Sequence, residues 1–253
     1  MKKLFFICGA LVLAGSLFAA NLDKTAILKK VAAVYNQPQM SVEMGMTVSV
    51  MDMSIPMSSK FWIKGNSFRV ETIGQLQQGL GSFQTTMISD GTTLWIQNSI
   101  TPDIMKIDLT KLPDSIRKSF VQSSFMGFDP QTLSQNSNFS DVTETETGNA
   151  KYYILTTTDL GAMTNNLPQN MQMMNQKFKK LVLWVDATTS QITRIETYGD
   201  AQQPGMDITF SNLSFSPIDG SLFQYTPPAG AQIQDMTNQM FQGVSGGNNP
   251  LQQ

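Results

Sequence analysis

Residues Phe83 to Asp108, FQTTMISDGTTLWIQNSITPDIMKID, show the most informative strand and turn pattern in the chain. Asp90-Gly91 lies between two β-prone runs, and an Asp-Gly pair supplies the positive φ angles that a two-residue hairpin turn requires. Thr92 to Ile96 continues as a second strand, and a third begins at Asp103 after a polar break. The spacing predicts a three-stranded antiparallel meander around which the remaining strands can form one large sheet.

Strand patterns continue on both sides of the meander. In Ser41 to Met53, apolar residues occupy every second position from Val42 to Val50, the clearest period of two in the chain. Met51 and Met53 shift the phase, which predicts a bulge or a twist before Pro56. The other predicted strands are Met57 to Lys64, Ser67 to Ile73, Phe139 to Thr147, Lys151 to Thr158, Phe178 to Asp186, Gln191 to Tyr198 and Met206 to Ser214.

Two segments predict helices. Leu22 to Tyr35 has one apolar helical face and a candidate N-cap at Asp23. Thr110 to Asn138 has no strand pattern and carries Phe120, Phe125 and Phe128 on short helix-compatible pieces. We therefore predict a mainly β fold with helices (α+β). Its antiparallel sheet of about nine to eleven strands is covered by the N-terminal helix and a helical lid, and a sheet this wide must curl or be covered.

The chain ends predict export and a polar tail. Residues 1–19 combine two lysines, an apolar run and small residues, so they read as a signal peptide cleaved near Ala19 or Ala20, with an uncleaved anchor as the alternative. Residues 20–235 form the predicted domain. Residues 236–253 are polar and rich in Gly and Asn, and we expect them to be disordered.

Composition argues against several functional classes. The chain has no histidine, and its only cysteine, Cys8, lies in the signal, which removes the usual general base and the usual zinc ligands. Without Lys2 and Lys3 the basic residues fall from 17 to 15 against 19 acidic ones, a net charge of −4 that argues against nucleic acid. There is no phosphate loop or dinucleotide fingerprint. We expect no enzyme activity, no cofactor and no metal.

The 17 methionines leave two interpretations open. Met44, Met46, Met51, Met53 and Met57 have M-x-M spacing, which in an exported protein is compatible with Cu(I) binding through thioethers. Met44 and Met46 also fit the apolar face of their strand, and flexible thioethers suit a surface that accepts varied acyl chains. The second interpretation is the favoured one.

The order of these motifs resembles the LolA-like outer-membrane lipoprotein carrier family. The similarity spans roughly residues 22–235. The matching pieces are FWIKGNSFRVE at Phe61 to Glu71, MISDGTTLWIQ at Met87 to Gln97, LVLWVDATTSQITRIETY at Leu181 to Tyr198, Phe210 to Asn212, and LFQYTPPAGAQI at Leu222 to Ile233. The resemblance implies an unclosed β half-barrel with helices in its mouth, and a hydrophobic cavity that holds lipoprotein acyl chains in the periplasm.

One motif departs from the family. Carriers of this family typically follow the Trp-x-Lys strand with an Arg-Pro pair whose arginine holds the lid closed. Here Trp62-Ile63-Lys64 is followed by Gly65-Asn66. Lys64 and Arg69 are the remaining latch candidates, although an ammonium lacks the planar fork of a guanidinium.

These observations predict a periplasmic carrier that binds acyl chains of lipoproteins or other lipids for transfer towards the outer membrane. We expect a monomer that meets inner-membrane donor and outer-membrane acceptor proteins. The alternatives are an envelope sensor or structural protein that binds a protein partner, and a Met-rich Cu(I)-binding protein. The predicted lipid-binding residues of the cavity and lid are Met44, Met46, Val48, Trp62, Phe68, Val70, Met87, Trp95, Phe120, Phe125, Phe128, Leu183 and Trp184.

Overall fold

The computed structural model of the protein describes residues 22–50, 53–75, 81–114, 117, 139–160, 178–200 and 202–239. One α-helix, α1 (Lys24–Tyr35), precedes the strands, and two short 3-10 helices are η1 (Leu109–Lys111) and η2 (Gly220–Phe223). The strands are β1 (Gln39–Val50), β2 (Met53–Lys64), β3 (Ser67–Gln75), β4 (Ser82–Ser89), β5 (Thr93–Asn98), β6 (Ile104–Asp108), β7 (Asp141–Thr147), β8 (Ala150–Thr157), β9 (Lys180–Asp186), β10 (Ile192–Tyr198), β11 (Met206–Ser214) and β12 (Ile233–Asp235).

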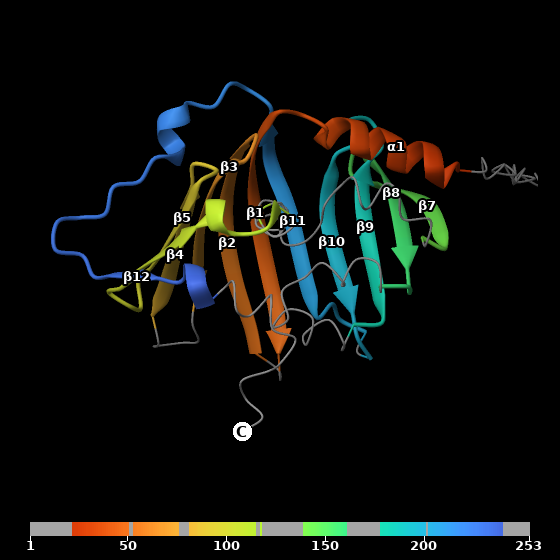
Figure 1. Cartoon of the computed structure of the whole chain (residues 1–253). Helices are drawn as coiled ribbons and strands as arrows, with labels where there is room; N and C mark the ends of the chain where they lie inside the picture. The colour runs from red at the N-terminus through yellow and green to blue at the C-terminus, as the bar shows by residue number, and fades with distance from the viewer. Residues whose placement is uncertain are drawn as a thin grey trace, which may run out of the picture.

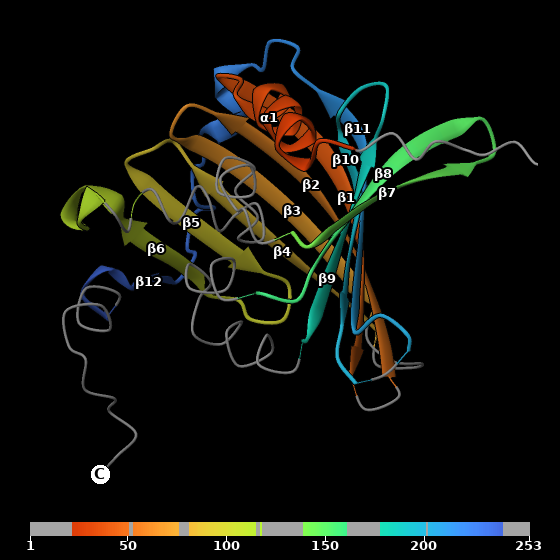
Figure 2. The same cartoon turned by 90° about the vertical axis from the view of Figure 1, so that its right-hand side faces the viewer.

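All of these strands belong to one 12-stranded sheet with the order β12-β6-β5-β4-β3-β2-β1-β11-β10-β9-β8-β7. Neighbours are antiparallel except for β12, which pairs with β6 in parallel. The sheet curls without closing, with α1 on its concave side (Figures 1 and 2). The predicted fold class is therefore confirmed. The additional strand is β12, whose three residues are too few to show a period.

The predicted meander is β4, β5 and β6. Gly91 has a φ of 91°, in the left-handed region that favours glycine. One carboxylate oxygen of Asp90 accepts hydrogen bonds from the backbone N–H groups of Thr92 and Thr93, both at 2.8 Å. The predicted two-residue turn is wrong, however, because Ser89 pairs with Leu94 and the four residues from Asp90 to Thr93 lie between them, with a positive φ at Gly91 but not at Asp90.

The structure corrects the end of the first predicted strand. Val50 of β1 pairs with Met53 of β2, so the chain reverses between them and Met53 belongs to the second strand. Pro56 lies within β2 and pairs with Thr47. Strands β2 and β3 begin to pair only at Met57, after the proline. The missing N–H of Pro56 therefore costs no hydrogen bond between β2 and β3.

Cross-strand register gives the sheet two distinct faces, because residues directly opposite each other project to the same side. Val42, Phe61 and Val70 are successive partners across β1, β2 and β3, and all are buried in the main core. They define the concave face, which α1 shares. Their sequence neighbours, such as Trp62 and Arg69, project to the convex face.

Helix α1 forms where its apolar stripe was predicted. The Asp23 side chain caps it by accepting from the Ala26 N–H at 3.1 Å. Ile27, Leu28 and Val31 are buried against the sheet. Tyr35 in the last turn accepts a hydrogen bond from the backbone N–H of Ile192 at 3.1 Å, which ties the helix to the start of β10.

The segment after β11 returns across the convex face of the other half of the sheet, and Figure 1 shows it running from the top of β11 to β12. Phe223 of η2 is 4% exposed. The Tyr225 ring lies 5.6 Å from that of Trp95 on β5. At the end of the segment, Thr237 Oγ1 accepts from the Asp108 N–H at 2.9 Å. A second, smaller apolar layer therefore covers the convex face here.

We predict that Leu28→Ala lowers the free energy of unfolding by about 2–5 kcal/mol, because it leaves a cavity between α1 and the sheet. Leu28 is 2% exposed. Lys29→Ala is the matched control, since Lys29 is exposed on the same helix and its loss should change stability by less than about 0.5 kcal/mol. Urea unfolding of both variants measures the difference. Equal values would show that α1 does not stabilise the core.

We also predict an alkaline loss of stability through Tyr35. Burial raises the pKa of Tyr35 from 10.0 to about 12, while the hydrogen bond from Ile192 lowers it in part. The unfolded chain ionises first, so the contribution is complete below pH 10 and is lost as the pH rises towards 12. The slope is at most about 1.4 kcal/mol per pH unit. Urea unfolding should show a shallower decline for Tyr35→Phe, and identical slopes would refute this.

Candidate functional site

The candidate site is the concave face of the sheet. Two cross-strand rows supply its apolar floor. One row runs Val42, Phe61, Val70, Met87, Ile96, Met105 from β1 to β6. The next runs Met40, Ile63, Phe68, Ser89, Leu94, Ile107 over the same strands. The alternation of each strand thus places nearly all its apolar residues on one side.

Helix α1 does not bury this face uniformly. Val42, Phe61 and Phe68 are at most 3% exposed and belong to the cluster that packs with α1. Met44, Val70, Leu94 and Ile107 of the same face are buried as well. The half-buried apolar side chains of β1 to β6 and β11 include Met40, Met46, Ile55, Met57, Ile63, Phe83, Met87, Ile96, Met105, Met206 and Phe210. Methionine is the commonest residue among them.

Met46 and Met57 form the centre of this half-buried part, because they are direct cross-strand partners on β1 and β2. Met206 on β11 lies beside them, opposite Val48. Thioethers are flexible and polarisable, so such a surface can adapt to apolar ligands of different shape. The copper interpretation of the methionines stays a prediction, since Met51 and the Met53 side chain lie outside the described residues.

Seven predicted lining residues lie on the concave face. They are Met44, Met46, Val48, Phe68, Val70, Met87 and Leu183. Phe68 and Leu183 are fully buried, so they support the floor and do not contact solvent. Phe120, Phe125 and Phe128 of the predicted lid lie outside the described residues, as do residues 1–19.

The tryptophan predictions are corrected. Trp62, Trp95 and Trp184 project to the convex face, opposite in phase to Phe61, Leu94 and Leu183 respectively. Trp95 packs under Tyr225, and the Lys106 ammonium lies 5.6 Å from its ring centroid. The reason is the period of two, which forbids neighbours in a regular strand from sharing a face.

The sequence prediction also missed residues. Met57, Ile96, Met105 and Met206 belong to the half-buried concave surface but were absent from the predicted lining. The sequence indicates that each of them faces the same side as the residues two positions away in its own strand. The sequence does not indicate which faces of neighbouring strands coincide, because that depends on which residues pair.

The two latch candidates contact the C-terminal segment. Lys64 Nζ donates to the carbonyl oxygen of Ile218 at 2.8 Å. Arg69 Nη1 donates to the carbonyl oxygen of Leu222 at 3.3 Å, while its Nε bonds Glu71 at 2.7 Å. Both cations lie on the convex half of the structure. The described residues therefore assign them to holding residues 218–222, away from the concave face.

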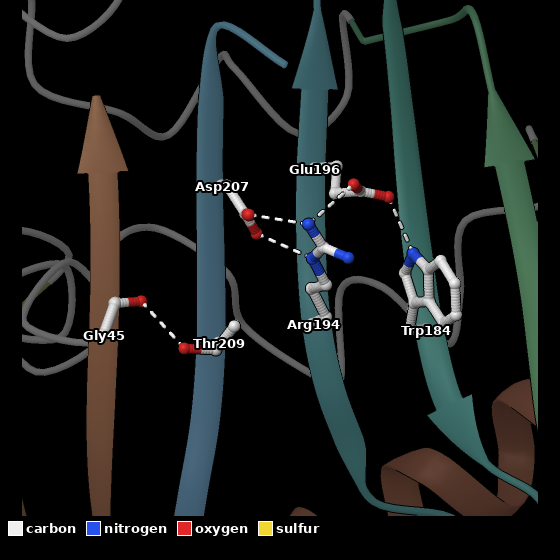
Figure 3. Close-up of polar contacts among 6 residues, drawn as sticks. All are labelled: Gly45, Trp184, Arg194, Glu196, Asp207 and Thr209. Atoms are coloured by element: carbon white, nitrogen blue, oxygen red, sulfur yellow. Dashed lines mark hydrogen bonds and ion pairs between the residues drawn. The ribbon is translucent and has the colours of Figure 1, made fainter. Parts of the chain in front are cut away.

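A polar network occupies the convex face of β9, β10 and β11 (Figure 3). Arg194 donates from Nε and Nη2 to the two carboxylate oxygens of Asp207 at 2.8 and 2.7 Å, and these hydrogen bonds raise the pKa of Arg194. Its Nη2 lies 3.1 Å from Glu196 Oε1. Trp184 Nε1 donates to Glu196 Oε2 at 2.7 Å, which satisfies a carboxylate that is 5% exposed. The network stabilises three adjacent strands.

A depression of about 320 Å³ lies on the same face over β1, β2, β3, β4 and β11. Gly45 lies at its floor, and the Thr209 hydroxyl donates to the Gly45 carbonyl oxygen at 3.4 Å (Figure 3). A Cβ at Gly45 would come within 2.9 Å of Thr209 Oγ1, so the close approach explains the glycine. Its polar wall includes the Lys60–Glu43 ion pair at 2.9 Å.

Over the part of the chain that the structure describes, no group of three or more acidic side chains is arranged to hold a metal ion. Within the same residues, no helix has the length and apolar character that crossing a membrane requires.

No family model matches the chain, and no curated protein matches it. Solved structures with a similar arrangement include an uncharacterized conserved protein from Thermus thermophilus, at 12% identity and a TM-score of 0.47, covering 83% of this chain and 97% of that one. A LolA superfamily protein from Nitrosomonas europaea has 12% identity and a TM-score of 0.29, covering 81% and 98%. The MucA/MucB complex of Pseudomonas aeruginosa matches with 12% sequence identity and a TM-score of 0.39. The match covers 83% of this chain and 62% of that one.

We predict that Lys64→Gln with Arg69→Gln speeds amide hydrogen exchange in residues 218–225, because both donors to that segment are weakened. Lys60→Gln is the control, since Lys60 is an exposed cation on the same strand that pairs only with Glu43 in the described structure. Exchange followed by mass spectrometry gives the readout. Unchanged protection in the double variant would contradict the assigned role.

Proposed function

We propose that this protein is a periplasmic carrier that holds acyl chains of lipoproteins or other lipids against the concave face of its sheet, for transfer towards the outer membrane. The proposal includes a signal peptide over residues 1–19 and export. The observation that carries it is the half-buried, methionine-rich part of the concave face around Met46, Met57 and Met87.

The energetics favour an acyl ligand for such a surface. Burial of a methylene contributes about 0.8 kcal/mol, so a chain of about 15 carbons offers roughly 12 kcal/mol of gross driving force. Ordering the chain and desolvating its polar end offset part of this gain. Release would nevertheless be slow without a partner or a movement that uncovers the ligand. A carrier with this site therefore requires donor and acceptor proteins that promote loading and unloading.

A second candidate is an envelope protein that binds a protein partner. The convex depression over Gly45 supports it, because polar side chains surround it and the neighbouring Ile73 is 49% exposed. The two functions use opposite faces of the sheet. Variants on one face therefore discriminate between them.

The test is the affinity of the purified full chain for a fluorescent palmitoyl fatty acid. We expect Met46→Gln with Met57→Gln to weaken binding by more than about tenfold, because two amides replace thioethers at the centre of the concave surface. Ile73→Gln is the matched control on the convex face of β3 and should bind as the wild type does. Mass spectrometry of solvent extracts from natively purified protein adds an independent readout.

Two outcomes would count against the carrier. Recovery of no lipid, together with no uptake of the fluorescent fatty acid, would refute acyl binding altogether. Weakening by Ile73→Gln, with no effect of the methionine changes, would place the fatty acid on the convex face and refute the concave site.

A further inference from the structure

Four hydroxyl side chains on the concave face are buried: Ser59, Ser89, Thr157 and Thr197. Three of them have partners. Ser59 Oγ lies 2.8 Å from Thr72 Oγ1, Ser89 Oγ accepts from the Gly91 N–H at 3.1 Å, and Thr157 Oγ1 accepts from the Asp159 N–H at 3.1 Å. A satisfied hydroxyl needs no ligand to explain it.

Thr197 differs from these three. It is 2% exposed, and its Oγ1 has no hydrogen-bond partner in the described structure. Leaving a buried hydroxyl without a partner is costly, so each such group in a folded protein calls for an explanation.

Its position points to the carrier surface. Thr197 is the penultimate residue of β10, whose first residue, Ile192, is the one bonded to Tyr35 of α1. It lies opposite Leu181 of β9 and Met206 of β11. Met206 in turn faces Val48, two residues along β1 from Met46. The unpaired hydroxyl thus borders the methionine-rich surface, on the same face of the sheet.

We propose that Thr197 is a specificity residue of the carrier, whose hydroxyl donates a hydrogen bond to the carbonyl oxygen of an ester- or amide-linked acyl chain. This inference rests on the proposed function and names the chemistry of its ligand. A pure hydrocarbon would leave the hydroxyl unpaired. An acyl carbonyl supplies the acceptor at the point where the polar end of the ligand begins.

The surroundings favour an uncharged carbonyl over a free carboxylate. The cross-strand neighbours of Thr197 are Leu181 and Met206, both apolar. The adjacent residues Glu196 and Tyr198 project to the convex face, where Glu196 contacts Arg194. A carboxylate beside Thr197 would thus lose its hydration next to two apolar cross-strand neighbours, which is far less favourable than burying an ester.

The experiment compares two fluorescent diacyl probes of equal chain length, one with ester links and one with ether links that lack carbonyls. We expect Thr197→Val to weaken binding of the ester probe by about fivefold and to leave the ether probe unchanged. Valine keeps the shape of threonine and removes only the hydroxyl. Thr197→Ser should keep the preference of the wild type for the ester.

Thr157→Val is the matched control, because its hydroxyl lies in the same row but already accepts from Asp159. Its ratio of ester to ether affinity should equal that of the wild type, whatever its effect on melting temperature. An unchanged ratio in Thr197→Val, with both probes bound, would overturn this inference and leave the carrier proposal intact. Failure of the wild type to bind either probe would overturn both.

Discussion

Antiparallel pairing with a period of two separates the side chains of a single sheet into two surfaces, and every other feature of this protein depends on how those surfaces are covered. Phe61 and its partner Val70 lie on one side, and Trp62 and its partner Arg69 lie on the other. A sheet of 12 strands is too wide to remain flat and uncovered. Because the sheet curls, the concave side chains pack around α1. The apolar side chains of the convex face must be covered by other segments.

On the concave side, α1 is the α-helix that packs on the sheet among the described residues. The buried face of α1 is made by Ile27, Leu28 and Val31, which is enough to bury only part of the floor. The half-buried remainder of the floor includes methionines, isoleucines and two phenylalanines. In an ordinary core, such methionines would be replaced by better-packed aliphatic side chains. Their place on one continuous face is the observation on which the proposed ligand site rests.

On the convex side, a polar network covers one half of the sheet and the segment after β11 covers the other half. Glu196 is almost fully buried, and it is stable there because Trp184 and Arg194 both bond to it. Towards the other edge, Trp95 is covered by Tyr225. Both halves of the sheet are therefore stabilised by contacts on the convex face as well as by the concave core.

Local structure could be predicted from the order of residues along the chain. Asp90-Gly91, the period of two in β1 and the Asp23 cap each act through neighbours in the chain, so the strands, the helix and the mainly β class were predictable from it. Tertiary structure alone decided which strand faces meet, because a shift of one residue moves every side chain to the opposite surface. The register places Met46 opposite Met57 and puts Trp62 and Trp184 on the convex face. It also brings Arg69 into contact with the Leu222 carbonyl of the C-terminal segment. Pairing across more than 150 residues, as between Arg69 and Leu222, leaves no trace in local sequence.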